Sequence, residues 1–280
     1  MIVSRTHGFV FMHNPKVAGS SVRAVLDKWR DPDVDLFATD PNPTAPLHRV
    51  DRAHIGIAEF AANYPDLWAQ TRDFPFYVLY RDPFSRFLSS VNEYCRVYGE
   101  TDIRFAAQAE RRNVFFGLID RLRALGTAEG VMDILELTHF RPQWIYLTPP
   151  EGADIRLRAF GLKEIPRFAT ELSGCIGETV DFGRENGSEQ FDLPLPMRRI
   201  LANNSVKKQL RKLPGAMWAM QQLRQRSAGT PQSGARLSVQ ERYGLTEAEH
   251  QEVETFVQGF YARDLGVISG LAQAAHPVEA

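Results

Sequence analysis

Short apolar segments alternate along this chain with longer segments in which apolar residues recur at helical spacing. Residues 9–13 follow Gly8 and are rich in aromatic and β-branched side chains, and residues 76–80 have the same character. This composition predicts two short buried strands. Residues 155–160 alternate apolar and polar positions at the start, which predicts a third strand.

A helical pattern follows each predicted strand. After the first strand, Ser20 or Ser21 is expected to cap a helix whose apolar stripe recurs at positions i, i+3, i+4 and i+7, namely Val22, Val25, Leu26 and Trp29. After the second, Pro83 stands at the start of a helix of about four turns. Residues 162–176 form the third. This repeated order predicts an α/β fold, a parallel sheet with helices on both faces.

The rest of the chain yields weaker expectations. Residues 31–50 contain four prolines and predict an irregular loop, and a short helix is expected over about 55–64. Residues 103–137 are expected to be helical. A last amphipathic helix is introduced by Thr246 with Glu249 three residues on, which is the capping-box pattern. We therefore expect a single domain over residues 1–270, with a basic loop region at 184–240 and a frayed tail at 271–280.

Composition narrows the functional classes. Lys and Arg total 33 and Asp and Glu total 34, so the net charge of −1 argues against bulk electrostatic binding of nucleic acid. With 2 cysteines the chain has no disulfide scaffold, which favours a reducing compartment. The longest early apolar run, residues 9–12, is too short for a membrane span. A cytoplasmic location is expected, with peripheral membrane attachment as the alternative.

One charge asymmetry lies within this neutral total. Residues 193–240 contain no Asp or Glu, and they carry nine basic residues, namely Arg198, Arg199, Lys207, Lys208, Arg211, Lys212, Arg224, Arg226 and Arg236. Such a bias is typical of a segment that meets an anionic partner. A solvated basic loop with no partner is the alternative interpretation.

Candidate chemistry lies first in the segment between the first strand and its helix. Its sequence is Asn14, Pro15, Lys16, Val17, Ala18, Gly19, Ser20 and Ser21. Small residues let the backbone approach a ligand, and N–H groups at a helix N-terminus favour an anion. The segment therefore predicts a P-loop-like phosphate cradle with Lys16 reaching the anion. It lacks the Walker A order of glycines and lysine, and an ordinary strand-to-helix turn is the alternative.

A second candidate segment, residues 80–89, follows the second strand. Arg81 stands at the strand end and Ser89 lies two helical turns along the next helix, so the two side chains could hold one phosphate between them. Asp82 is expected to cap that helix. The alternative is a structural pair between Arg81 and Asp82, with Ser89 as a surface hydroxyl.

Together the two segments resemble the signature of sulfotransferases that use 3′-phosphoadenosine 5′-phosphosulfate (PAPS). The first is similar to the family's 5′-phosphosulfate loop, and the second to its 3′-phosphate motif of Arg-Asp-Pro followed by Arg and Ser. The similarity extends to the carbohydrate branch, which includes the uronyl and heparan 2-O-sulfotransferases and their bacterial relatives. It is carried there by residues 54–60, 139–143 and 160–164. The resemblance is strong over residues 8–100 and weaker to about 176.

The resemblance implies a role for each matched residue. Lys16 would stabilise the charge that gathers on the leaving group, and residues 15–21, that is Pro15, Lys16, Val17, Ala18, Gly19, Ser20 and Ser21, would bind the 5′-phosphosulfate. Arg81 and Ser89 would bind the 3′-phosphate. His54 would be the general base, with His139 as the rival and Glu59 as a distant third. His13 is interpreted as a packing residue beside the loop. No metal is implied, because no ligand-spaced His, Cys and Asp cluster occurs.

The expected reaction is sulfuryl transfer from PAPS to a hydroxyl of a carbohydrate or other small acceptor, such as a glycan or glycolipid. Two alternatives remain at this point. One is a non-catalytic nucleotide- or glycan-binding relative, and the other is a P-loop-like kinase that uses ATP.

Overall fold

A computed structural model describes the chain at residues 1–34, 39–41, 49–98, 107–183, 240–241 and 244–275. The fold divides into two compact units, each assembled from separate stretches of sequence. The first unit comprises residues 1–87, 125–185 and 257–280, and the second comprises residues 88–124 and 186–256. The single-domain expectation for residues 1–270 stays a prediction.

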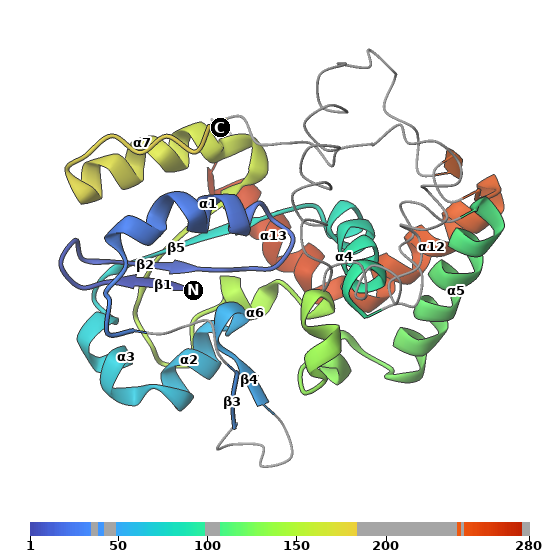
Figure 1. The fold of residues 1–280 in the computed structure, drawn as a ribbon, viewed down its shortest axis with the longest axis horizontal. Coiled ribbons are helices and arrows are strands. Elements are labelled where there is room, and N and C mark those ends of the chain that lie inside the picture. The colour runs from blue at the N-terminus through green and yellow to red at the C-terminus, as the bar shows by residue number, and fades with distance from the viewer. Residues whose placement is uncertain (35–38, 42–48, 99–106, 184–239, 242–243, 276–280) are drawn as a thin grey trace, which may run out of the picture. The chain divides into compact units, whose positions relative to one another are not determined.

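A four-stranded sheet forms the centre of the first unit (Figure 1). Its strand order is β1-β2-β5-β6, formed by Ile2–Ser4, Phe9–Met12, Pro75–Tyr80 and Arg156–Gly161. The three predicted strands β2, β5 and β6 are parallel, as expected. The expectation of a purely parallel sheet is wrong at one edge, because β1 pairs with β2 antiparallel. Three residues are too few for a hydrophobic period to be recognised in the sequence.

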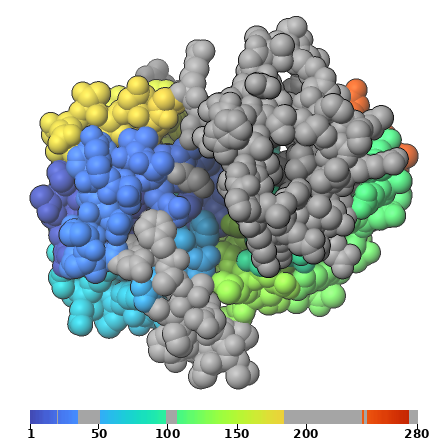
Figure 2. All heavy atoms as spheres, in the orientation of Figure 1, coloured from blue at the N-terminus to red at the C-terminus, as the bar shows by residue number. Residues whose placement is uncertain are grey.

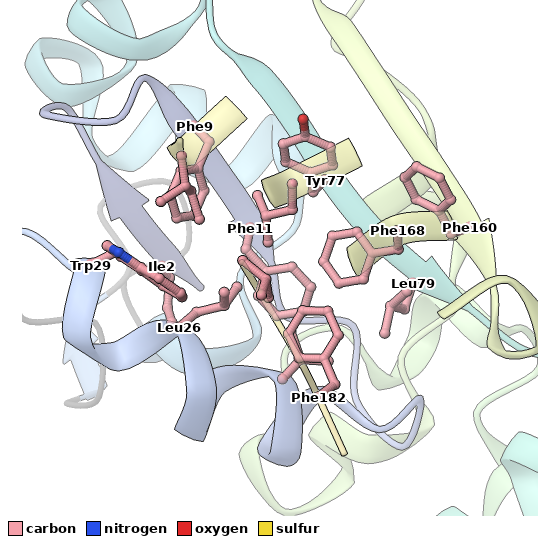
Figure 3. Close-up of a cluster of buried hydrophobic side chains, with 14 of the residues drawn as sticks. Ile2, Phe9, Phe11, Leu26, Trp29, Tyr77, Leu79, Phe160, Phe168 and Phe182 are labelled. Atoms are coloured by element: carbon pink, nitrogen blue, oxygen red, sulfur yellow. The ribbon is translucent and has the colours of Figure 1, made fainter. Parts of the chain in front are cut away.

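Side chains alternate across this sheet and form a core on each face. On one face, Phe11 and Tyr77 pack against Phe168 of α7 (Ile165–Ile176), with ring centroids 6.0 and 5.7 Å apart (Figure 3). Leu26 of α1 (Gly19–Leu26) belongs to the same cluster. Figure 2 shows α7 in yellow on the surface beside α1 in blue. This layer holds α1 against the sheet, so the segment between β2 and α1 is anchored at both ends.

The opposite face of the sheet has its own core. Val10 and Met12 of β2 and Val78 of β5 point into it. It is covered by four helices, namely α2 (Ile57–Asn63), α3 (Pro65–Thr71), α6 (Trp144–Leu147) and α13 (Ala262–Ala275). The sheet is therefore covered on both faces, as its near-continuous apolar strands require.

Several local expectations need correction. Helix α1 begins after Ala18 and no side chain caps it, so the predicted serine cap is wrong. Residues 31–50 are not wholly irregular, because β3 (Thr39–Pro41) pairs antiparallel with β4 (Arg49–Asp51). The expected tail at 271–280 is helical as far as the end of α13.

The second unit is helical in its described part. It contains most of α4 (Pro83–Val97), α5 (Gln108–Ala124) and most of α12 (Glu247–Phe260). Arg123 of α5 pairs with Glu252 of α12 at 2.7 Å. The predicted capping box is confirmed: Glu249 accepts from the Thr246 N–H at 2.9 Å, and the Thr246 hydroxyl accepts from the Glu249 N–H at 3.3 Å.

Two further expectations concern longer segments. The helix expected over 103–137 is shorter, because α5 gives way to 3₁₀ turns at Ala128–Val131 and Leu135–Phe140. The acid-free segment 193–240 lies outside the described residues except for its last residue, so its role is untested. Of the helices in the described ranges, none has the length and apolar character needed to cross a membrane.

Candidate functional site

The two candidate segments follow the carboxyl ends of two neighbouring parallel strands, β2 and β5, and the buried side chain of Gln143 joins them. The side chain of Gln143 donates from Nε2 to the Arg81 carbonyl at 2.8 Å and accepts from the Arg81 N–H at 3.1 Å. Its Oε1 also accepts from Asn14 Nδ2 at 3.1 Å. Because Asn14 follows β2 and Arg81 follows β5, these bonds fix the separation of the two strand ends. In the sequence, Gln143 is marked only by its place in residues 139–143, one of the stretches similar to the sulfotransferase family.

A buried carboxylate, that of Asp264, holds the backbone at Gln143. The buried carboxylate of Asp264, on α13, accepts from the backbone N–H groups of Gln143 at 2.8 Å and Trp144 at 2.9 Å. Burial raises the pKa of Asp264, and the nearby positive charge of Arg86 opposes this increase. Helix α13 thus bonds to the start of α6, which positions Gln143 against the carboxyl ends of β2 and β5.

The segment from Asn14 to Ser21 has an unusual backbone. Lys16 and Ala18 both adopt left-handed conformations, with φ of 65° and 62°. The Ala18 carbonyl accepts from Ser21 and Val22 and so starts α1. Within the described part of the chain, no backbone acceptor pairs with the N–H groups of Ala18 or Gly19. The first N–H groups of a helix have no acceptor within the helix, and they can donate to an anionic ligand.

A buried arginine fixes the start of this segment. The Arg86 side chain, fully buried on α4, donates from Nε to the Pro15 carbonyl at 3.2 Å and from a second nitrogen to the Arg141 carbonyl. Its guanidinium carbon lies 5.9 Å from the ring centroid of Tyr261. Arg86 therefore acts as a support beneath the loop rather than as a group open to a ligand. In sequence Arg86 is one of the residues that follow Arg-Asp-Pro, and nothing in that pattern indicates its burial.

In the second candidate segment, the predicted helix cap by Asp82 is confirmed. Asp82 caps α4 by accepting from the Ser85 N–H at 2.8 Å. Arg81 is partly exposed, and its backbone is held by Gln143. Ser89 is partly exposed on α4 and belongs to the second unit. The joint use of Arg81 and Ser89 on one phosphate stays a prediction.

Three histidines gather beside the loop. His54 ends a 3₁₀ turn at Arg52–His54, and its ring centroid lies 4.4 Å from that of His13 and 5.4 Å from that of His139. His54 Nδ1 lies 3.1 Å from the His13 carbonyl oxygen. Since a carbonyl can only accept, Nδ1 carries the proton, and the neutral ring has its basic lone pair on Nε2. The candidate base thus has the tautomer that a base needs.

The backbone of His54 is fixed from behind. Its carbonyl accepts from the Tyr146 hydroxyl at 2.7 Å and from Arg141 at 3.2 Å. Arg141 is buried and pairs with Glu59 at 2.8 Å, and Glu59 also accepts from the Gly56 N–H. The Glu59 carboxylate is therefore committed to an ion pair and to the start of α2, which leaves it poorly suited to be the third candidate base.

Burial keeps two of these histidines neutral. It lowers the pKa of His54 to about 3, and the hydrogen bond to the His13 carbonyl opposes this only in part. The pKa of His13 is lowered by burial and then by the neighbouring His54. Desolvation disfavours the charged form of an imidazole, so both rings are uncharged near pH 7.

Comparisons with protein-family models, with curated proteins and with solved structures found no match for this chain. Among the described residues, no group of three or more His, Cys, Asp or Glu side chains is arranged to hold a metal ion. Family membership therefore remains a resemblance, and the functional conclusion depends on the geometry of the site.

Proposed function

We propose that this protein is a sulfotransferase that moves the sulfuryl group of PAPS to a hydroxyl of a carbohydrate or other small acceptor. The observation that supports this most is the loop of residues 14–21. It presents N–H groups of Ala18 and Gly19 without backbone acceptors among the described residues, and it carries Lys16. These groups fit the phosphosulfate end of PAPS.

PAPS supplies an electron-poor sulfuryl group on a phosphate leaving group. The acceptor oxygen forms a bond to sulfur while the bond from sulfur to the 5′-phosphate oxygen breaks, and that electron pair leaves with 3′-phosphoadenosine 5′-phosphate (PAP). The acceptor's proton passes to Nε2 of His54, whose Nδ1 is already occupied by its bond to His13. Lys16 stabilises the charge that gathers on the leaving oxygen.

The second segment supplies selectivity for the nucleotide. Arg81 stands at the carboxyl end of β5, beside the end of β2 from which the first loop starts. Ligands of parallel sheets bind at this edge. Arg81 is proposed to bind the 3′-phosphate that distinguishes PAP from ATP and ADP, because a guanidinium pairs with phosphate in forked geometry.

Ligand-dependent stability tests this proposal. PAP should raise the melting temperature of the full chain, because a ligand at a hundredfold excess over its Kd stabilises by about 2.7 kcal/mol. ATP and ADP should raise it far less, since both lack the 3′-phosphate. The Arg81→Ala variant is the matched control and should lose most of the difference between PAP and ADP. No shift with millimolar PAP would reject the sulfotransferase proposal.

A further inference from the structure

His13 differs from an ordinary packing residue in one respect. Its side chain is 4% exposed, and its Nδ1 is buried with no hydrogen-bond partner among the described residues. Buried polar atoms are nearly always paired, so this unpaired nitrogen bears on which ring atom carries the proton. The ring also contacts two neighbours that matter for the proposed reaction, Gly19 and His54.

The contact with Gly19 places the far edge of the ring against the loop. A methyl group on Gly19 would lie 2.0 Å from Cδ2 and 2.3 Å from Nε2 of His13. Only glycine leaves room for the imidazole there. Gly19 is the first residue of α1, and its N–H is among those without a backbone acceptor in the described chain. The Nε2 edge of His13 thus lies beside the N-terminal donors of the helix.

The proton of the neutral ring belongs on this edge. A proton on Nδ1 would be a buried N–H with no acceptor, which costs more than an unpaired lone pair. The tautomer with its proton on Nε2 avoids this cost and places an N–H beside Gly19. Burial lowers the pKa of His13, in keeping with an uncharged ring.

We propose that His13 is a direct ligand of the bound anion, donating from Nε2 to an oxygen of the phosphate or sulfate group that residues 14–21 hold. It acts beside Lys16 as a neutral donor. This inference rests on the proposed function only in taking the ligand to be a phosphate or sulfate ester. It replaces the interpretation of His13 as a packing residue.

Nuclear magnetic resonance on the full chain labelled with ¹⁵N-histidine tests this directly. PAP and inorganic pyrophosphate are titrated separately, and adenosine, which lacks phosphate, is the control. The Nε2 resonance of His13, assigned by its loss in His13→Gln, should shift with both anions and should not shift with adenosine. Calorimetry with PAP should show about tenfold weaker binding, or more, for His13→Leu, since a hydrogen bond to a charged group is lost.

Matched variants separate donation from packing. Gln places its amide nitrogen near the position of Nε2, and Asn places its own near Nδ1, so His13→Gln should retain more PAP affinity than His13→Asn. Binding of PAP with an unmoved His13 resonance would overturn the inference and leave the proposed function standing. A His13 shift with pyrophosphate but no binding of PAP would support the inference and reject the proposed function. If neither PAP nor pyrophosphate binds, the inference about His13 and the proposed function are both wrong. The titration uses the wild-type chain, so it tests the inference even where a variant does not fold.

Discussion

The Nδ1 atom of His54 lies 3.1 Å from the carbonyl oxygen of His13, the residue that directly follows strand β2. This bond links the candidate base to the strand that leads into the candidate phosphate loop. It also settles the tautomer, because only an N–H can pair with a carbonyl. A histidine 41 residues away in sequence is thereby oriented by the backbone directly before the loop.

The first prediction concerns the pH dependence of stability. The folded-state pKa of His54 is about 3 and that of His13 is also lowered, both below the unfolded value of about 6.5. The unfolded state therefore binds more protons, so the free energy of unfolding should be highest above about pH 6.5 and fall as the pH drops below it. Each histidine contributes at most about 1.4 kcal/mol per pH unit.

Urea unfolding between pH 4 and 8 measures this dependence. His54→Asn keeps a donor near the position of Nδ1 but cannot titrate, so its unfolding free energy should depend less steeply on pH than that of the wild type. Parallel curves for the two proteins would show that His54 titrates normally in the folded state.

Much of the first unit was predictable, for local reasons. Strands β2 and β5 are short, apolar and bounded by turn residues, and each is followed by a helix with clear periodicity. The segments that carry Lys16 and Arg81 were located from these boundaries. Strand β1 was missed because it depends on its pairing with β2 and not on a period of its own.

The support of the site was not predictable, because it depends on long-range contacts. Gln143 bonds to Asn14, which lies 129 residues away in sequence, and to Arg81, 62 residues away. The left-handed φ of Ala18 was equally hidden, since alanine normally avoids that region and only the surrounding fold imposes it. Burial of Arg86 accompanies its bonds to the carbonyls of Pro15 and Arg141, which lie 71 and 55 residues away in sequence, and a motif does not encode such contacts.

The second prediction concerns Lys16. Lys16→Ala should lower kcat by about 10²–10³, because the ammonium is proposed to meet charge that grows only as the bond to the leaving group breaks. Binding of PAP should weaken much less, since the backbone donors of Ala18 and Gly19 remain. Steady-state kinetics with calorimetry separates the two effects. Lys16→Arg is the matched control that retains the charge, and an unchanged kcat in Lys16→Ala would remove the assigned role.

The third prediction concerns Arg81. Arg81→Ala should reduce the preference for PAP over 5′-AMP, because only PAP carries the 3′-phosphate. Both backbone groups of Arg81 bond to Gln143, so truncation of the side chain should leave the strand end in place. Calorimetry with both nucleotides gives the affinity ratio. Equal ratios in variant and wild type would mean that the 3′-phosphate binds elsewhere.

The last prediction concerns His54 as the general base. His54→Ala should lower kcat by about 10²–10⁴, the usual contribution of a positioned base, and leave the Kd for PAP close to that of the wild type. His139→Ala is the matched control, because it removes a neighbouring imidazole whose ring lies 5.4 Å from that of His54. We expect it to lower kcat less than His54→Ala does. A large loss in His139→Ala with activity retained in His54→Ala would move the base role to His139.

The pH profile supplies a second, independent readout for the same residue. In the free protein the pKa of His54 is about 3, so kcat/KM should show no acid limb in the ordinary imidazole range near pH 6.5. A bound anionic donor stabilises the imidazolium, so the acid limb of kcat should lie at higher pH than that of kcat/KM. The His54→Ala variant should lose this displaced limb. If the limb persists unchanged in that variant, another group accepts the proton and the tautomer set by the His13 carbonyl serves structure alone.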